Sequence, residues 1–195
     1  PKEFFAASMT MDLSNQNKLG EFHEELKRID IKVVRPDINR CFEDFQFDEE
    51  NFYYALGGIK SVGLEAISNV VKERKENGNF KSINDFLNRV SPKDINKLQL
   101  EGLVKAGAFD NIDNNRQALF NSIPNFILKT KNIYENKAAN QIDLFDSDEE
   151  QDKEIVLNIE DWNFEDRLSR EFEAMGFFIS DHPLNQFKEI FDDYK

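Results

Sequence analysis

The sequence predicts a mainly α fold built from helical hairpins, with one small β-hairpin. Two observations support this prediction. Apolar residues recur at spacings of three and four over most of the chain, which is typical of amphipathic helices. Aromatic residues alternate with other residues around positions 45–54, on both sides of a polar tetrapeptide, which is typical of a short β-hairpin. The chain of 195 residues is long enough for one domain or two small ones.

Composition excludes several classes of protein. No run of about 18 apolar residues exists, so no transmembrane helix is expected. The N-terminus lacks the regions of a signal peptide and begins without Met, as if cut from a longer protein. A single cysteine, Cys41, excludes an intramolecular disulfide and suits a reducing compartment, so we expect a cytoplasmic location. With only His23 and His182 besides, no zinc site is expected.

The net charge of −13 is unevenly distributed along the chain. Residues 141–173 contain 13 Asp and Glu against 3 Lys and Arg, whereas residues 60–105 contain 9 Lys and Arg against 6 Asp and Glu. The acidic residues are therefore concentrated in the later part of the chain, and the region 60–105 is mildly basic. Global acidity does not exclude contact between this region and nucleic acid.

The first part of the chain is expected to form two helices, a short strand and the β-hairpin. Residues 1–11 are interpreted as the tail of a helix and residues 13–30 as an amphipathic helix. Residues 31–34 form the short strand, and the hairpin pairs residues 45–47 with residues 52–54. We expect the aromatic side chains of the hairpin to pack in the core, with stacking on nucleic-acid bases as the alternative.

The stretch 56–67 is the one around which the rest of the chain is organised. It is predicted to form a short helix, a tight turn at residues 61–63 and a second helix. Gly63 is expected to supply the backbone freedom that a sharp turn between helices needs. The second helix is expected to bury an apolar stripe made of Leu64, Ile67, Val70 and Val71.

The start of this second helix is a candidate anion site. The backbone N–H groups of residues 61–65 are expected to be unpaired there, at the positive end of the helix dipole. This arrangement is typical of a helix-hairpin-helix motif, which holds a DNA backbone phosphate without reading bases. An ordinary αα-hairpin with a glycine turn is the alternative, and this stretch alone does not decide between them. The candidate DNA-binding residues are Lys60, Ser61, Val62, Gly63, Leu64 and Lys72.

Two further helices are expected to form a second pair. Ser82 is the predicted N-cap of the first. Pro92 is predicted at the first position of the second, which ends at residues 106–107. Lys93 and Lys97 are further candidates for contacts with DNA phosphates, and an ordinary solvated lysine face is the alternative.

A helix is expected at residues 114–131, bent or interrupted by Pro124. Residues 138–151 are rich in Asn, Asp and Glu and have no sustained apolar stripe, so we expect an exposed linker. A helical pattern returns at Trp162 and ends near residue 180, before one last short helix.

The acidic linker contains one compact apolar insertion, Gln141-Ile142-Asp143-Leu144-Phe145. Such an insertion indicates a short motif that docks into a pocket of another protein, and folding back onto its own domain is the alternative. Burying Leu144 and Phe145 contributes about 1.5–3 kcal/mol each before ordering costs, which suits a contact of roughly micromolar affinity.

Five stretches of the chain, taken in order, resemble the alpha subunit of bacterial replicative DNA polymerase III. They span nearly the whole sequence and are Pro1-Lys2-Glu3-Phe4-Phe5-Ala6-Ala7, Pro36-Asp37-Ile38-Asn39, residues 56–63, Lys105-Ala106-Gly107-Ala108-Phe109-Asp110 and residues 176–184. The departures from the family pattern are Arg35, Ala55, Gly58, Ser61 and Asp181. Among these, Ser61 stands where the general hairpin pattern has its first glycine.

The resemblance implies a division of the chain into five parts. They are the end of the fingers region with the β-hairpin (1–52), the helix-hairpin-helix DNA-binding module (53–110), a helical connector (111–137), an acidic linker (138–156) and a C-terminal helical segment (157–195). The resemblance also implies that residues 141–145 are an internal motif that binds the sliding clamp, the beta subunit. Gln141 would bond at the rim of the clamp pocket, and Leu144 and Phe145 would fill it. The implied partners are duplex DNA, the clamp and other replicase subunits, with no membrane.

Members of this family are DNA-directed DNA polymerases, and their magnesium-binding aspartates belong to the palm, upstream of this region. No equivalent set of carboxylates is found here, so we expect no cofactor in this chain, with magnesium implied only for the parent polymerase. The chain is therefore predicted to be a non-catalytic segment that binds duplex DNA during replication and tethers the polymerase to the clamp. A protein-interaction module with purely structural hairpins is the alternative. A repair ligase or excision nuclease is disfavoured, because no nucleophilic lysine motif or metal cluster accompanies the hairpins.

Overall fold

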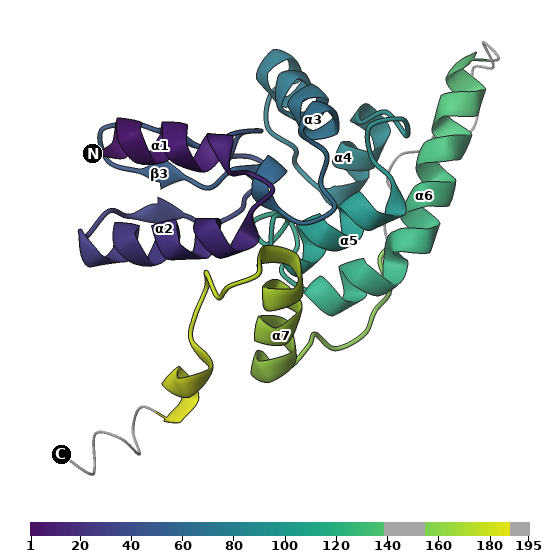
Figure 1. The fold of residues 1–195 in the computed structure, drawn as a ribbon. Helices are drawn as coiled ribbons and strands as arrows, with labels where there is room; N and C mark the ends of the chain where they lie inside the picture. Colours follow the sequence, from purple (N-terminus) through teal and green to yellow (C-terminus); the bar gives the residue numbers. More distant parts are fainter. Residues whose placement is uncertain (139–154, 188–195) are drawn as a thin grey trace.

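The computed structural model describes residues 1–138 and 155–187 (Figure 1). The fold is mainly α with a small sheet, which confirms the predicted class. The helices are α1 (Lys2–Met11), α2 (Gln16–Arg28), α3 (Leu64–Asn77), α4 (Ile83–Arg89), α5 (Lys97–Lys105), α6 (Arg116–Ala138) and α7 (Phe164–Met175), with short 3₁₀ helices η1 (Leu56–Gly58) and η3 (Pro183–Phe187). None of these described helices is long and apolar enough to cross a membrane.

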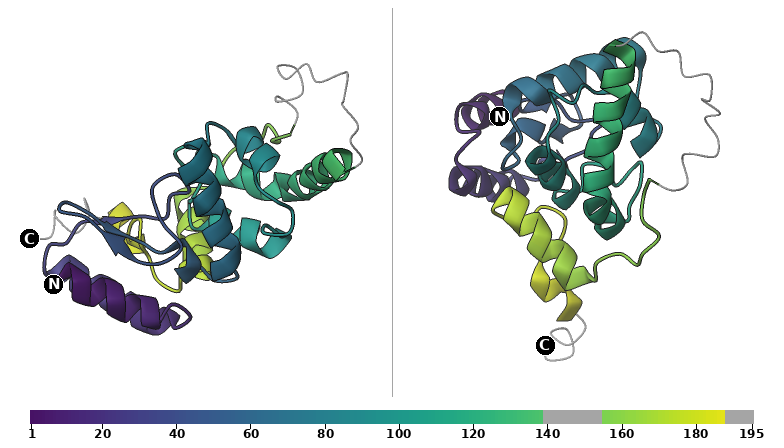
Figure 2. Two further views of the ribbon diagram at one scale, coloured as in Figure 1. Left: turned by 90° about the horizontal axis from the view of Figure 1, so that it is seen from above. Right: turned by 90° about the vertical axis from the view of Figure 1, so that its right-hand side faces the viewer.

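The sheet has three strands of two residues each, β1 (Val33–Val34), β2 (Gln46–Phe47) and β3 (Phe52–Tyr53). β3 is central, pairs with β2 in antiparallel fashion and pairs with β1 in parallel fashion. The predicted β-hairpin is therefore confirmed. α1 and α2 lie side by side at the N-terminal end, and the sheet lies against one side of this pair (Figures 1 and 2).

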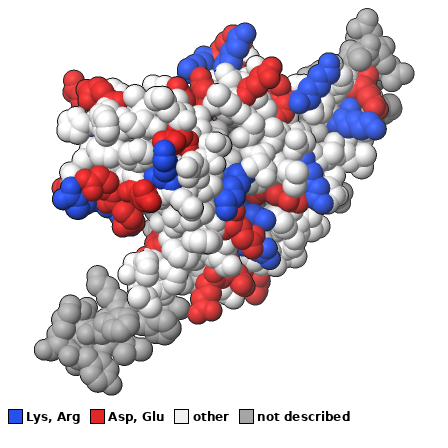
Figure 3. Space-filling model, in the orientation of Figure 1, with Lys and Arg blue, Asp and Glu red and all other residues white. Residues whose placement is uncertain are grey.

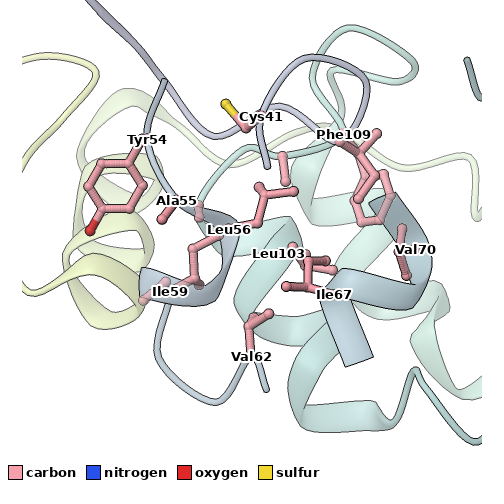
Figure 4. Close-up of a cluster of buried hydrophobic side chains, with 14 of the residues drawn as sticks. Cys41, Tyr54, Ala55, Leu56, Ile59, Val62, Ile67, Val70, Leu103 and Phe109 are labelled. Atoms are coloured by element: carbon pink, nitrogen blue, oxygen red, sulfur yellow. The ribbon is translucent and has the colours of Figure 1, made fainter. Parts of the chain in front are cut away.

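One hydrophobic core extends from α1 to the segment after α7. At its centre η1 and α3 meet α5, and Leu56, Ile59, Ile67 and Leu103 converge there (Figure 4). Three of the four alternating aromatic residues of the hairpin region pack into the same core, as expected: Phe45, Phe52 and Tyr54 are at most 3% exposed. The expectation was wrong for Phe47, which is 39% exposed on β2. β3 and the buried Tyr54 thus join the sheet to η1 across the predicted boundary at residue 52, and the proposed division there stays a prediction.

The expected start of the fifth helix was wrong. Pro92 lies in a turn, where the backbone N–H groups of Asp94 and Ile95 both donate to Ser91 O, and α5 begins only at Lys97. The reason is a capping box: Asn96 Oδ1 accepts from Gln99 N at 3.0 Å, and Asn96 N donates to Gln99 Oε1 at 2.8 Å. By contrast, the predicted N-cap of α4 is confirmed, because Ser82 Oγ accepts from Asp85 N.

Two other helices differ from expectation at their ends. α6 continues through Pro124 to Ala138 and changes direction along its length, so the proline bends the helix but does not end it (Figure 1). α7 ends at Met175, before Phe178, because Gly176 adopts a left-handed conformation with φ of 81° and caps the helix.

An extended segment, residues 155–163, connects the end of the undescribed region 139–154 to α7. It is fastened to the N-terminal half of α6: Leu157 N donates to Ser122 Oγ, Asn115 Nδ2 donates to Ile159 O, and Gln117 N donates to Asp161 Oδ1. Ile155 and Val156 pack against the core. The chain therefore returns to the body of the molecule before α7 begins.

The side chain of His23, a residue of α2, is buried against Phe177, with ring centroids 5.1 Å apart. Neither ring nitrogen has a hydrogen-bond partner among the described residues. Burial therefore disfavours the imidazolium and lowers the pKa of His23 to about 4 from the usual 6.5.

Because the unfolded chain takes up the His23 proton first, the free energy of unfolding is expected to fall as the pH decreases from 6.5 towards 4. Between pH 8 and pH 5 the contribution of His23 is about 2 kcal/mol. Urea unfolding of wild type and His23→Leu at both pH values measures it, since the variant should lose this part of the pH dependence. A His23→Leu variant that keeps the full pH dependence of the wild type would contradict the assignment.

Candidate nucleic-acid interface

The turn between η1 and α3 takes its sharp bend at Ser61. This residue has a φ of 67°, a left-handed conformation that residues with a Cβ atom rarely adopt. Gly63, which the sequence analysis expected to supply the unusual backbone conformation, has φ −75° and ψ 135°, which any residue can adopt. That expectation was wrong, and Ser61 occupies the position at which a glycine would be favoured.

The start of α3 has an unusually large number of free backbone donors. α3 has no side-chain cap, whereas Asn15, Ser82, Asn96 and Asn163 cap α2, α4, α5 and α7. Five N–H groups have no acceptor among the described residues, and they belong to Ser61, Gly63, Leu64, Glu65 and Ala66. Unpaired donors at the positive end of a helix dipole form a site for an anion, such as a phosphate.

The turn is set deeply against α5. Lys60 O lies 2.7 Å from the position that a Cβ atom on Gly102 would occupy, so only glycine allows this approach. Gln99 Nε2 lies 3.3 Å from the corresponding position on Gly63. The first turns of α3 and α5 are therefore neighbours, and the two helix pairs present their turns together.

The structure places the other candidates of the first turn as follows. Lys60 and Ser61 are exposed, and Leu64 is 49% exposed, so Leu64 does not belong to the predicted buried stripe. Val62 is buried and its N–H donates to Ile59 O, so it packs the turn and offers no free donor. Lys72 lies two turns further along α3, about 12 Å from its start, and its ammonium is 3.9 Å from Glu76.

The second turn offers fewer donors than the first. The capping box of α5 occupies two of its N–H groups, and those of Lys97 and Leu98 have no acceptor in the described part of the chain. Lys93 is exposed, with its ammonium 5.4 Å from the centre of the Tyr134 ring on α6. Lys97 is exposed at the first position of α5 and lies 3.7 Å from Glu101.

The charges near these turns are mixed. On the face drawn in Figure 3, Lys and Arg are interspersed with Asp and Glu, and they form no continuous basic band. Arg74, which stands among the basic residues of α3, is buried and donates to the backbone oxygens of Ile38 and Cys41. Backbone donors, more than side-chain cations, therefore distinguish this surface.

The predictions on metal and clamp binding concern residues away from the turns. Among residues 1–138 and 155–187, no three His, Cys, Asp or Glu side chains are grouped so that they could hold a metal ion. The magnesium implied for the parent polymerase thus has no fitting set of ligands in this part of the chain. The predicted clamp motif, residues 141–145, lies outside the described residues.

Residues 30–119 match the family model of the helix-hairpin-helix motif. This range contains both turns described above, with η1, α3, α4 and α5 between its limits. The geometry of the first turn and this match together define a helix-hairpin-helix module, the first of the two readings that the sequence left open.

The chain is similar to DNA polymerase III alpha subunits along nearly its whole length. It is 41% identical to the alpha subunit of Caulobacter vibrioides over 184 residues, which are 94% of this chain and 16% of the relative. It is 36% identical to those of Borreliella burgdorferi (100% of this chain, 17% of the relative) and Campylobacter jejuni (97% and 16%). The chain therefore matches a segment of the DNA polymerase III alpha subunit family, which confirms the predicted resemblance, and it spans about one sixth of the length of these relatives.

Gly102, which allows the close approach of Lys60 O to α5, is not among the residues predicted from the sequence. A signal was present, because a glycine in the interior of a helical pattern costs about 1 kcal/mol and often marks a close approach. For the left-handed conformation of Ser61 the signal was the hairpin pattern, which has its first glycine at this position, although serine itself is ordinary in turns.

Exchanging the residue types at the turn should reveal which position is strained. We expect Ser61→Gly to raise the free energy of unfolding by about 0.5–1 kcal/mol, because it relieves the left-handed strain at a small cost in chain entropy. Gly63→Ala should change stability by less than about 1 kcal/mol, because its conformation suits alanine and only a flexible glutamine side chain is near. Urea denaturation measures both variants. A large decrease in the free energy of unfolding of Gly63→Ala, together with a decrease for Ser61→Gly, would contradict the geometry of the turn.

Proposed function

We propose that this chain is a non-catalytic segment of a replicative DNA polymerase that binds the backbone of duplex DNA and tethers the polymerase to its sliding clamp. The observation that carries the DNA-binding part is the uncapped start of α3, where five N–H groups beside the exposed Lys60 have no acceptor in the described part of the chain. A phosphate oxygen is the ligand that such a cluster of donors suits best.

This mode of binding suits an acidic chain. Backbone amides carry no net charge, so they hold a phosphate without a large basic surface, and they read no base. With few lysines at the turns, we expect a weak affinity for DNA, with a dissociation constant on the order of 10–100 μM at moderate salt. Such affinity is useful within a larger polymerase whose other contacts keep the DNA close.

The tethering part of the proposal concerns residues 141–145. Its support is the sequence Gln-Ile-Asp-Leu-Phe within an acidic stretch, in a chain similar to DNA polymerase III alpha subunits. On the C-terminal side of the undescribed residues, the segment 155–163 is bonded to α6 through Leu157 N and Ser122 Oγ.

No catalytic step is derived for this chain. Polymerisation and its magnesium ions are proposed for the parent polymerase alone, along with other replicase subunits as partners. A cytoplasmic location also stays a prediction.

DNA binding should be independent of sequence and should weaken with salt, with a slope set by the few lysines at the turns. Fluorescence anisotropy of two unrelated duplexes, titrated at several salt concentrations, should give equal affinities. Lys60→Ala should reduce the slope of log K against log salt by about 0.9, the share of one phosphate contact.

Lys27→Ala is the matched control, because Lys27 is also an exposed lysine and lies on α2, away from the turn. Equal effects of Lys27→Ala and Lys60→Ala, or different affinities for the two duplexes, would refute binding at the turn. The same titration of Lys72→Ala, Lys93→Ala and Lys97→Ala shows how far the contact extends.

Clamp binding should depend on the two apolar side chains of the motif. Titration of the chain with its sliding clamp should show roughly micromolar affinity, and Leu144→Ala with Phe145→Ala should abolish it, because each side chain loses about 1.5–3 kcal/mol of burial. Leu157→Ala with Phe164→Ala is the control, since it removes two exposed apolar side chains outside the motif. Unchanged binding by the 144/145 variant would remove the tether from the proposal.

A protein-interaction module remains the second candidate, favoured by the mixed charges in Figure 3 and the net charge of −13. Its signature is clamp binding by a chain that shows no affinity for duplex DNA at low salt.

A further inference from the structure

The turn before α3 is held from outside its own hairpin. Gly58 O accepts a hydrogen bond from Gln16 Nε2 of α2 at 2.9 Å, and Lys60 N donates to Ala174 O of α7 at 2.9 Å. α5 closes the third side through the contact between Lys60 O and Gly102. Three helices that are distant in sequence thus fix this short piece of backbone.

The bond to α7 orients the peptide group that enters the turn. It directs the N–H of Lys60 into the molecule, and the next residue, Ser61, then takes its left-handed conformation. A residue with a Cβ atom keeps such a conformation only where its surroundings impose it. The free donors that follow therefore depend on contacts made before the turn.

The carbonyl group of Ala174 can accept the hydrogen bond from Lys60 N because it lies at the C-terminal end of α7. Ala174 lies in the last turn of α7, where carbonyl groups lack partners within the helix. Gly176 closes the helix through its N–H, which donates to Phe172 O at 2.8 Å. The position of Ala174 O thus depends on how the chain is held around this end.

Glu171 holds that end of α7 in place. Its side chain is 0% exposed, and its Oε1 accepts from Ile179 N at 2.8 Å and from Ser180 N at 2.9 Å. Its Oε2 lies 3.6 Å from Nη1 of the buried Arg116, at the start of α6. The Glu171 carboxylate therefore connects the segment after α7, at residues 179–180, to the start of α6.

We propose that Glu171 is a positioning residue for the DNA-binding turn and acts through Ala174 O on the amide of Lys60. The inference deepens the proposed function, because the ligand of the positioned amides is the phosphate of duplex DNA. It also assigns α7, which lies outside the matched range 30–119, to the DNA-binding unit.

The first test needs no DNA. Amide hydrogen exchange by NMR should show the Lys60 amide exchanging about tenfold faster or more in Glu171→Ala, with shifted resonances for residues 61–66. Amides in the core of α4 should keep their rates. Glu171→Gln retains an oxygen for the amides of Ile179 and Ser180, so the exchange rate of the Lys60 amide should return to that of the wild type.

Glu173→Ala is the matched control. Glu173 lies on the same helix, is half exposed and has its contacts with Lys105 and Arg170 only, among the described residues. Glu173→Ala should leave the exchange rate of the Lys60 amide unchanged. The inference would be overturned if the Lys60 amide exchanged at the wild-type rate in Glu171→Ala, or if all amides exchanged faster to the same extent. If Glu171→Ala does not fold, Glu171→Asp replaces it, since its shorter side chain should accelerate the Lys60 amide selectively, and the same two outcomes would overturn the inference.

The second test measures duplex affinity by anisotropy in low salt. Binding should weaken roughly tenfold in Glu171→Ala, recover in Glu171→Gln and stay unchanged in Glu173→Ala. If the wild type binds no duplex, the proposed function fails while the exchange data still decide the positioning of the turn. If the wild type binds and Glu171→Ala binds equally well, the positioning inference fails and the proposed function stands.

Discussion

The close packing of the turn before α3 against α5 and α7 is the constraint on which the rest of this structure depends. Lys60 contributes both groups of its backbone: its carbonyl rests on Gly102 of α5, and its N–H bonds to the end of α7. Side chains on both sides, Ile59 and Val62, then enter the core with Leu103 (Figure 4). Because two backbones meet here without intervening side chains, the geometry tolerates little change, and the donors at the start of α3 keep a fixed arrangement.

The same constraint supports the proposal that an acidic chain binds DNA at this turn. A helix start that lacks a side-chain cap leaves its donors free, and at α3 no asparagine or serine competes for them. At α5 the capping box satisfies two donors internally, so the two turns are unequal despite their similar layout. Affinity from backbone donors is modest, which fits a segment that spans about one sixth of the relatives it matches.

The comparison of particular elements shows where sequence reasoning works. Local signals were reliable at Ser82, where a cap and its partner lie three residues apart, and for the existence of the β-hairpin, although Phe47, which fits the alternation, is exposed. They failed at Pro92, since a proline suits a turn as well as a helix start, and at Leu64, whose spacing fits the stripe although it lies on the exposed side. The family was reached from short stretches in a fixed order, and the relatives bear it out.

The sequence by itself determined the mainly α fold, the position of the first hairpin and the resemblance to DNA polymerase III alpha subunits, because these follow from periodicity and from motifs within short stretches. Only the tertiary structure decided that Ser61, not Gly63, takes the left-handed conformation, and that Gly102 and Ala174 hold the turn. The physical reason is that backbone conformation at a tight turn is imposed by contacts with distant segments. No local pattern records such contacts, since they join residues as many as 114 positions apart.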